Sequence, residues 1–189
     1  MEDDAPIMLI RHAEKPQDGE QAVNSVGQPD ERSLSVTGWM RAGALVRYFA
    51  MPEPRNGHSR IVRPVHLLAA RATDTRPSTR PSDTLQPLAQ ALGLKVDESW
   101  SSEDPLPELA AQLRQLQGPV LVCWRHDTLP ALANELLQRA EGPERWPQHC
   151  FDMVWVIEQE LLSRTLAQVP QRLLPGDSTH ALRRSRKAA

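Results

Sequence analysis

The chain has 189 residues, which is enough for one domain with a hydrophobic core. Its formal net charge of −2 gives it no general attraction to nucleic acid. Its two cysteines form no metal-binding pattern, and its apolar runs are far shorter than the ~20 residues that cross a membrane. The acidic start, Met1–Asp4, lacks the apolar segment of a signal peptide, so we expect a cytoplasmic protein without a membrane partner.

The first predicted element is a buried strand over residues 7–10, because four consecutive apolar residues are too few for a helix. This strand runs directly into Arg11 and His12. Ligands of open α/β sheets bind beyond the carboxyl ends of the strands. A guanidinium grips phosphate oxygens in pairs, and an imidazole can act as a nucleophile. The pair therefore indicates a phosphate site, although a salt-bridging arginine and a strand-end histidine on a surface loop explain it about as well.

Further elements follow in order. Residues 13–34 are polar and aperiodic and predict a long loop beside this site. Apolar residues at helical spacing then predict a helix over 38–50 with Thr37 as its N-cap. A second loop, 52–65, carries several arginines and leads to a short predicted strand over 67–70.

Two more helices are predicted in the middle of the chain. Apolar residues recur at helical spacing from Leu85 to Leu92, and Gly93 ends this helix. Pro87 removes a backbone donor, so we expect an irregular or kinked first turn. Asp104 and Pro105 predict the N-cap and first residue of the next helix.

A second buried strand, over 120–124, ends in Arg125 and His126 and so repeats the pattern of the first strand. Another helix follows, and residues 151–157 and 161–166 predict an antiparallel hairpin. Strands alternating with helices predict an α/β fold with a mostly parallel sheet, helices on both faces and an antiparallel edge strand.

The chain shows no internal repeat and no second domain, so we expect a single domain over 1–175. Residues 176–189 end in a basic run that predicts a flexible C-terminal tail.

Two histidines, His12 and His126, are thus expected at one edge of the sheet, each preceded by an arginine. Arg80 comes at the start of the Leu85–Leu92 helix, where free backbone N–H groups and the helix dipole favour an anion. Together with Arg11 it predicts a pocket that holds and neutralises phosphoryl oxygens.

Two other chemistries are weaker. A metal site would need a third ligand such as Asp127 or Glu103, but Arg11 and Arg125 would repel the cation. A serine hydrolase would need a G-x-S-x-G elbow, which the sequence lacks.

The chain resembles the histidine phosphatase superfamily, in the branch related to cofactor-dependent phosphoglycerate mutase. Five short motifs in the same order carry the resemblance, and each is weak alone. They are Leu9–Pro16, Leu34–Gly38 with Arg41 and Ala42, Arg80–Thr84 with Pro87–Ala89, Cys123–His126 with Leu129 and Pro130, and Phe151–Val156.

The resemblance implies a three-layer α/β/α sandwich and a phosphohistidine intermediate formed without a metal or other cofactor. Carried over by position, His12 is the nucleophile, and Arg11, Arg80 and His126 complete the pocket around the phosphoryl group. The family also implies an acidic proton donor from the loop after the Arg80 helix. Glu103 is our candidate, and the alternatives are Glu98, Asp104 and Glu108.

Two departures from the family pattern bear on function. Ala13 replaces the usual glycine after Arg-His, in a form that fits phosphatases better than mutases. Arg125 stands where many relatives carry a small residue, and it either adds recognition of substrate charge or points away.

The leading expectation is therefore a metal-independent phosphatase that acts on a small phosphorylated molecule. One alternative is phosphotransfer of the phosphoglycerate mutase type, which the short chain disfavours. The other is a phosphate- or phosphoprotein-binding protein with little catalysis. The sequence leaves the identity of the substrate and the oligomeric state open.

Overall fold

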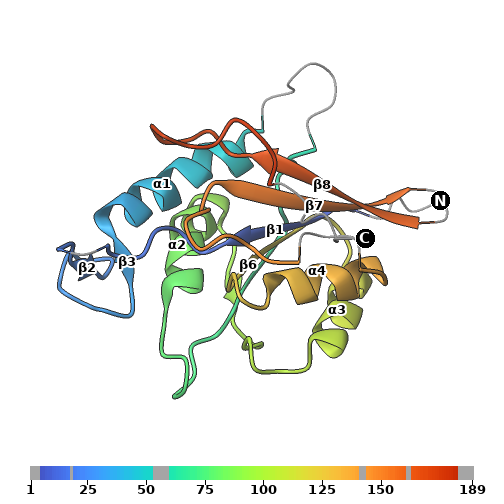
Figure 1. Ribbon diagram of the computed structural model, residues 1–189, viewed down its shortest axis with the longest axis horizontal. Helices are drawn as coiled ribbons and strands as arrows, with labels where there is room; N and C mark the ends of the chain where they lie inside the picture. The colour runs from blue at the N-terminus through green and yellow to red at the C-terminus, as the bar shows by residue number, and fades with distance from the viewer. Residues whose placement is uncertain (1–4, 18, 53–59, 141–143, 161–162, 183–189) are drawn as a thin grey trace, which may run out of the picture.

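The sheet of this protein is built from short apolar strands that the sequence pattern marks clearly. The computed structural model describes residues 5–17, 19–52, 60–140, 144–160 and 163–182. Figure 1 shows the strands crossing the centre of the molecule, with helices on both sides. Among the described residues, no helix is long and apolar enough to cross a membrane.

Six strands form the main sheet in the order β5-β4-β6-β1-β7-β8. They are β1 (Ile7–Arg11), β4 (His66–Ala69), β5 (Val96–Asp97), β6 (Val120–Trp124), β7 (Met153–Glu160) and β8 (Ser163–Pro170). Neighbouring strands from β5 to β1 pair in parallel, whereas β7 runs antiparallel to both β1 and β8. The predicted hairpin and antiparallel side of the sheet are therefore confirmed.

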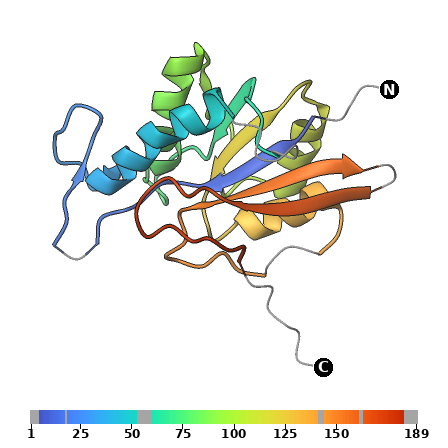
Figure 2. The ribbon, with the colours of Figure 1, turned by 90° about the horizontal axis from the view of Figure 1, so that it is seen from above.

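Helices cover both faces of the sheet, as expected for three layers. They are α1 (Val36–Ala50), α2 (Arg80–Leu92), α3 (Leu106–Gln115) and α4 (Leu129–Leu137). α1 and α2 lie on one face and α3 and α4 on the other, and the view from above separates the two layers (Figure 2). The predicted three-layer α/β/α sandwich is confirmed.

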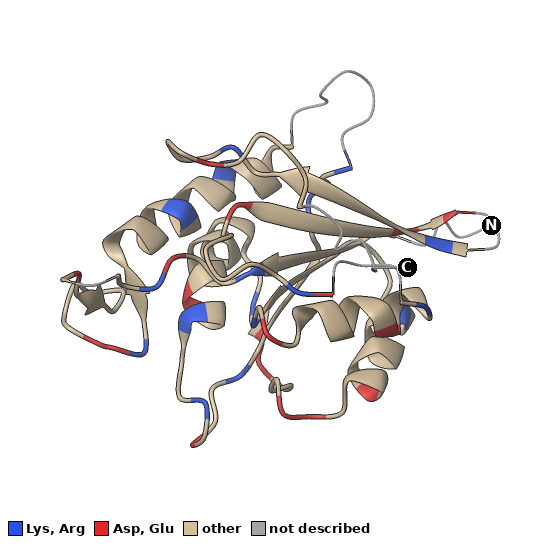
Figure 3. Cartoon of the chain, viewed as in Figure 1, with Lys and Arg blue, Asp and Glu red and all other residues tan. Residues whose placement is uncertain are grey.

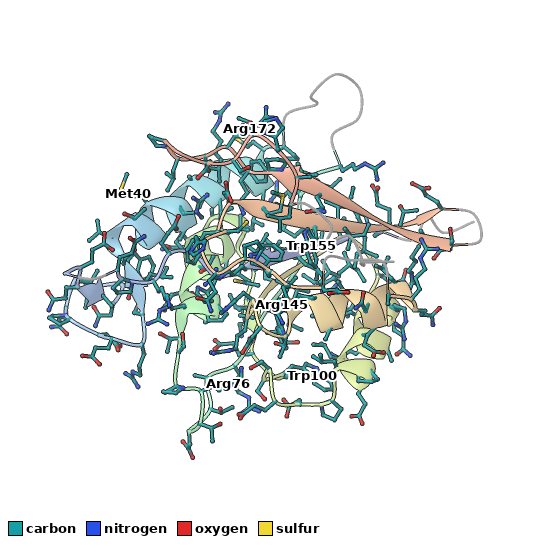
Figure 4. All side chains as sticks on the ribbon, in the orientation of Figure 1. Met40, Arg76, Trp100, Arg145, Trp155 and Arg172 are labelled. Carbon is teal, nitrogen blue, oxygen red and sulfur yellow. The ribbon has the colours of Figure 1, made fainter. Side chains whose placement is uncertain are left out.

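Strand alternation explains the two cores. Ile7 and Leu9 of β1 pack in the cluster under α3 and α4, while Met8 and Ile10 pack in the cluster under α1 and α2. All four side chains are buried, because a strand covered on both faces has no residue left for solvent. In Figure 4, Trp155 lies inside the molecule.

The predicted loop over 13–34 contains a small antiparallel pair, β2 (Ala22–Val23) with β3 (Leu34–Ser35). The N-cap of α1 is Ser35 rather than Thr37, because the Ser35 hydroxyl accepts the Gly38 N–H at 3.1 Å. The sequence could not separate two hydroxyl residues, two positions apart, that are both good caps.

Two other helix starts differ from expectation. α2 runs as one helix from Arg80 through Pro87, since tertiary packing holds the turn that lacks a backbone donor. The N-cap of α3 is Pro105 rather than Asp104. The Asp104 carboxylate instead accepts the Ser101 N–H at 2.6 Å and closes the turn before the helix.

Packed structure continues beyond residue 175. Asp177 forms an ion pair with Arg41 of α1 at 2.7 Å, and the Leu182 N–H donates to Gln168 of β8 at 3.0 Å. The basic run of the predicted tail, residues 183–189, lies outside the described residues.

Candidate active site

The two Arg-His pairs follow neighbouring parallel strands. Arg11 pairs in register with Trp124, and the His12 N–H donates to the Trp124 carbonyl at 3.3 Å. Because β1 and β6 run in the same direction, their carboxyl ends meet at one edge of the sheet. The structure therefore brings His126 to the side of the sheet that carries His12.

Arg11 is a buried cation held by neutral partners. Its Nη1 donates to the carbonyl oxygens of Gln148 at 2.5 Å, Pro147 at 3.3 Å and Cys150 at 3.3 Å. Its guanidinium carbon lies 3.9 Å from the centroid of the Phe151 ring. Burial lowers the pKa of Arg11 to about 10, which leaves it charged at neutral pH. No described carboxylate neutralises it through a salt bridge, so its charge is available to an anion.

His12 is neutral and oriented through one ring nitrogen. Its Nδ1 lies 2.7 Å from the Ala13 carbonyl oxygen. A carbonyl can only accept, so Nδ1 carries the proton and Nε2 carries the lone pair. Burial, and then the charge of Arg11, lower the pKa of His12 to about 3. The ring therefore presents an unprotonated Nε2 at neutral pH.

Arg80, the first residue of α2, is held by the carbonyl oxygens of the 31–33 segment. Its Nε donates to Ser33 at 2.8 Å and its Nη2 to Glu31 at 2.6 Å. Burial and the nearby Arg125 lower the pKa of Arg80. Its own charge contributes to the low pKa of His12, so it lies within electrostatic range of the nucleophile candidate.

His126 completes the group. Burial, and then the charge of Arg11, lower its pKa, so the free protein favours the neutral ring. The preceding Arg125 lies 3.7 Å from Asp127, and Asp127 also pairs with Arg76 at 2.6 Å. The charge of Arg125 also contributes to the lowered pKa of both Arg80 and His126, so Arg125 lies within electrostatic range of the site.

The structure therefore gathers four of the predicted site residues: Arg11, His12, Arg80 and His126. In Figure 3, basic segments at the end of β1 and at the start of α2 lie on the same side of the sheet. Among the described residues, no three histidine, cysteine or acidic side chains are grouped to hold a metal ion.

Glu103 is not brought to these four residues by any contact that the structure shows. Its carboxylate accepts hydrogen bonds from the hydroxyls of Thr73 and Thr75, both at 2.6 Å. These bonds lower the pKa of Glu103 and favour its ionised form. Of the alternative acids, Glu98 accepts from Ser82 at 2.9 Å.

Sequence reasoning missed the role of Thr84. Its buried hydroxyl accepts the Ala13 N–H at 2.8 Å and donates to the Arg80 carbonyl at 2.7 Å. One hydroxyl thus ties the backbone after His12 to the first turn of α2. The available signal was a threonine four residues after Arg80, where a hydroxyl can bond the preceding helical turn.

Sequence reasoning also missed an ion-pair network behind the nucleophile loop. The Arg41 guanidinium contacts the carboxylates of Glu14 and Asp177, both at 2.7 Å, and the Gln171 side chain at 3.0 Å. Gly38 lets α1 pack closely against the backbone of Glu14, because a Cβ at this position would overlap the Glu14 carbonyl oxygen. Glu14 and Arg41 both stood in the family motifs, but nothing in the sequence paired them.

Two cavities lie beside the site. One of about 470 Å³ is lined by residues of the 14–17, 148–152 and 174–177 segments, among them Phe151, and by Thr37 and Arg41 of α1. The other, of about 620 Å³, lies between the 15–31 loop and Arg80. Both are candidate places for the part of a substrate beyond its phosphate.

The sequence matches no protein-family model and no curated protein. The structure is similar to protein histidine phosphatase SixA complexed with tungstate, with a TM-score of 0.54, 14% identity, and coverage of 88% of this chain and 97% of that one. The chain has the histidine phosphatase fold.

Two further solved structures share this fold. The protein assigned as phosphohistidine phosphatase SixA in Agrobacterium tumefaciens gives a TM-score of 0.52 at 19% identity, covering 88% of this chain and 98% of that one. Mycobacterial glucosyl-3-phosphoglycerate phosphatase in complex with VO3 gives a TM-score of 0.51 at 15% identity, covering 86% of this chain and 97% of that one. At these identities the likeness establishes the fold, and the activity of this chain is a separate question.

Proposed function

We propose that this protein is a metal-independent phosphatase that hydrolyses a phosphomonoester through a phosphohistidine intermediate on His12. The observation that carries the proposal is the state of the His12 ring. It is neutral, its Nδ1 is bonded to the Ala13 carbonyl, and it lies within the field of Arg11, Arg80 and His126.

In the first step, His12 Nε2 forms a bond to phosphorus while the bond between phosphorus and the ester oxygen breaks. The electron pair of that bond leaves with the oxygen. Arg11 and Arg80 stabilise the negative charge on the other phosphoryl oxygens. A bound phosphate dianion raises the pKa of His126, so this ring adds a third positive group to the pocket.

In the second step, water attacks the phosphorus of phosphohistidine and the bond to Nε2 breaks, which releases inorganic phosphate. A base that takes a proton from the water assists this step. The lowered pKa of Glu103 suits a base better than a proton donor. We therefore assign Glu103 to the second step, and the first step then depends on a leaving group that needs little protonation.

The structural relatives support a site of this kind. SixA is named a protein histidine phosphatase and was solved with tungstate, and the mycobacterial phosphatase was solved with VO3. Both ligands are oxyanions that imitate a phosphoryl group. The two relatives are named for different substrates, so neither name identifies the substrate of this chain.

The test is hydrolysis of p-nitrophenyl phosphate with EDTA present. We expect turnover by the wild type and none by His12→Ala. His66→Ala is the matched control: His66 bonds the Gln117 carbonyl at 2.8 Å at the opposite end of the sheet, so this variant should keep its activity. Loss of wild-type activity in EDTA would contradict the proposal.

The opposing hypothesis is a phosphate-binding protein with little catalysis, and the hydrogen bonds that hold Glu103 to Thr73 and Thr75 instead of the four-residue group favour it. It predicts that tungstate raises the melting temperature of the wild type although no substrate is turned over. Wild-type turnover that His12→Ala abolishes would exclude this hypothesis.

A further inference from the structure

The start of α2 is bound to the 31–33 segment by its backbone as well as by the Arg80 side chain. The Thr79 N–H donates to the Arg32 carbonyl oxygen at 3.0 Å, just before the helix begins. Arg80 reaches the same segment through the carbonyl oxygens of Ser33 and Glu31, at 2.8 Å and 2.6 Å. The orientation of the Arg80 guanidinium therefore depends on where this segment lies.

Asp83, in the first turn of α2, joins the same two parts of the site. Its Oδ2 accepts the Ser33 hydroxyl at 2.7 Å and the Thr79 hydroxyl at 2.8 Å. Ser33 is thus held at both of its polar ends, because its hydroxyl binds Asp83 and its carbonyl binds Arg80. Ser33 is buried, so water does not readily replace Asp83 as the partner of the hydroxyl. The Asp83 carboxylate therefore closes a ring of contacts that runs through Ser33 to Arg80.

The two carbonyl acceptors leave part of the Arg80 guanidinium for a ligand. A guanidinium carries five N–H groups. The carbonyls take the N–H of Nε and one N–H of Nη2, and Nη1 lies 3.4 Å from the Ser78 hydroxyl, which is longer than a usual hydrogen bond. A shift of the carbonyls would turn the whole planar group. Their positions thus set which N–H groups of Arg80 are available to an anion.

The charge of Asp83 by itself opposes the binding of an anion. Burial and then Arg125 lower the pKa of Arg80, and the Asp83 carboxylate counteracts both, so its charge acts on the guanidinium. A negative charge close to a phosphate site repels phosphate. The value of this carboxylate to the site therefore lies in the two hydroxyl groups that it holds.

We propose that Asp83 is a positioning residue of the phosphate pocket, which holds Ser33 and Thr79 so that the carbonyl oxygens of the 31–33 segment orient Arg80 toward the phosphoryl oxygens. Asp83 acts through Arg80 and not on the substrate directly. The inference rests on the proposed function for the identity of the pocket, but the anion affinity that it predicts is measurable without turnover.

Tungstate binding, measured by calorimetry, tests the inference. Loss of a carboxylate alone should tighten the binding of an anion, whereas loss of the positioning contacts should weaken it. We expect Asp83→Ala to raise the dissociation constant about tenfold, which corresponds to the loss of about one charge-assisted contact. Asp83→Asn should bind at least as tightly as the wild type, because both hydroxyls donate to one oxygen, which an amide carbonyl can replace.

A double-mutant cycle shows whether Asp83 acts through Arg80. Arg80→Ala should weaken tungstate binding about 10- to 100-fold, and the addition of Asp83→Ala should then weaken it no further. Asp97→Ala is the matched control. This exposed aspartate at the end of β5 accepts the N–H of its neighbour Ser99 at 2.8 Å, and its loss should leave the affinity unchanged.

Ser33→Ala provides a second variant in case Asp83→Ala does not fold. It removes one donor to Asp83 and keeps the Ser33 carbonyl that binds Arg80, so we expect a dissociation constant about threefold higher, in line with one neutral hydrogen bond. Circular dichroism shows which variants are folded.

Unchanged or tighter tungstate binding by the folded Asp83→Ala or Ser33→Ala variant would overturn the inference. Equal weakening by Asp83→Ala with and without Arg80, or equal weakening by Asp83→Asn and Asp83→Ala, would also overturn it. Any of these results together with wild-type hydrolysis of p-nitrophenyl phosphate would leave the proposed function standing. Tungstate binding with the expected dependence on Asp83 but without hydrolysis would instead contradict the proposed function and leave this inference standing.

Discussion

Two guanidinium nitrogens of Arg41 contact the Glu14 carboxylate, Nε at 2.9 Å and Nη2 at 2.7 Å from the same oxygen. The pair joins α1 to the backbone just after His12. On its other side, the guanidinium binds Asp177 near the end of the described chain. These two bonds raise the pKa of Arg41 although its burial opposes them. One side chain therefore fixes the nucleophile loop and the wall of the cavity beside Phe151.

We expect Arg41→Met to lower the free energy of unfolding by about 3 kcal/mol, because it leaves two carboxylates without their partner. Urea denaturation measures the loss. Arg60→Met is the control, since the Arg60–Glu158 pair is substantially exposed, and such pairs contribute about 0–1 kcal/mol. Similar small losses in both variants would show that the Arg41 network does not stabilise the fold.

Thr84→Val should reduce kcat/KM and lower the free energy of unfolding by about 1–3 kcal/mol, because the buried Ala13 N–H loses its acceptor. Thr84→Ser keeps the hydroxyl and should retain most of the activity. Kinetics with p-nitrophenyl phosphate and urea denaturation check both effects. Full activity in Thr84→Val would mean that this hydroxyl does not position the His12 loop.

Two glycines of α1 should respond in opposite ways to alanine. At Gly38 a Cβ would overlap the Glu14 carbonyl oxygen and approach the Leu34 Cβ to 3.1 Å, so we expect a loss of about 2 kcal/mol. At Gly43 a Cβ would meet nothing within 4 Å, so alanine should add about 0.5–1 kcal/mol through helix propensity. Thermal unfolding of the two variants compares them directly, and a stabilising Gly38→Ala would contradict the close approach.

The buried neutral His12 should make stability depend on pH. Its pKa is about 3 in the folded protein and near 6.5 in the unfolded chain, so between these values the unfolded state binds the extra proton. The free energy of unfolding therefore falls as the pH decreases below about 6.5, by up to about 1.4 kcal/mol per pH unit from this group. In His12→Gln the free energy of unfolding, measured by urea denaturation, should decline less steeply from about pH 7 to pH 5. An equal decline in the variant and the wild type would show that folding does not lower the pKa of His12.

Glu103→Gln should slow the second step of the proposed reaction. We expect kcat to fall by the same factor for p-nitrophenyl phosphate and phenyl phosphate, with phosphohistidine accumulating after rapid quenching. Glu108→Gln, an acid in the first turn of α3, is the control and should not accumulate it. A larger effect on phenyl phosphate than on p-nitrophenyl phosphate would restore Glu103 to the role of proton donor.

The sequence by itself predicted the longer strands and the helices that cover them, whereas the two-residue strands β2, β3 and β5 were not predicted. Apolar runs such as 7–10 and 120–124 have few ways to be buried, and an Arg-His pair directly after each run must lie at the carboxyl end of a strand. Parallel pairing of β1 and β6 then brings His12 and His126 to one edge. The strands and the Arg-His pairs that follow them are local in sequence, so local patterns predict them.

Only the tertiary structure decided which distant side chains meet. Arg41 and Asp177 are 136 positions apart, and their contact depends on how the segment after β8 packs against α1. The same holds for Thr84 and Ala13, which a hydroxyl joins across two elements, and for Glu103, which binds two threonines on another loop. Side chains at such separations come into contact only when the layers of the fold pack together. No local periodicity in the sequence specifies which of them will meet.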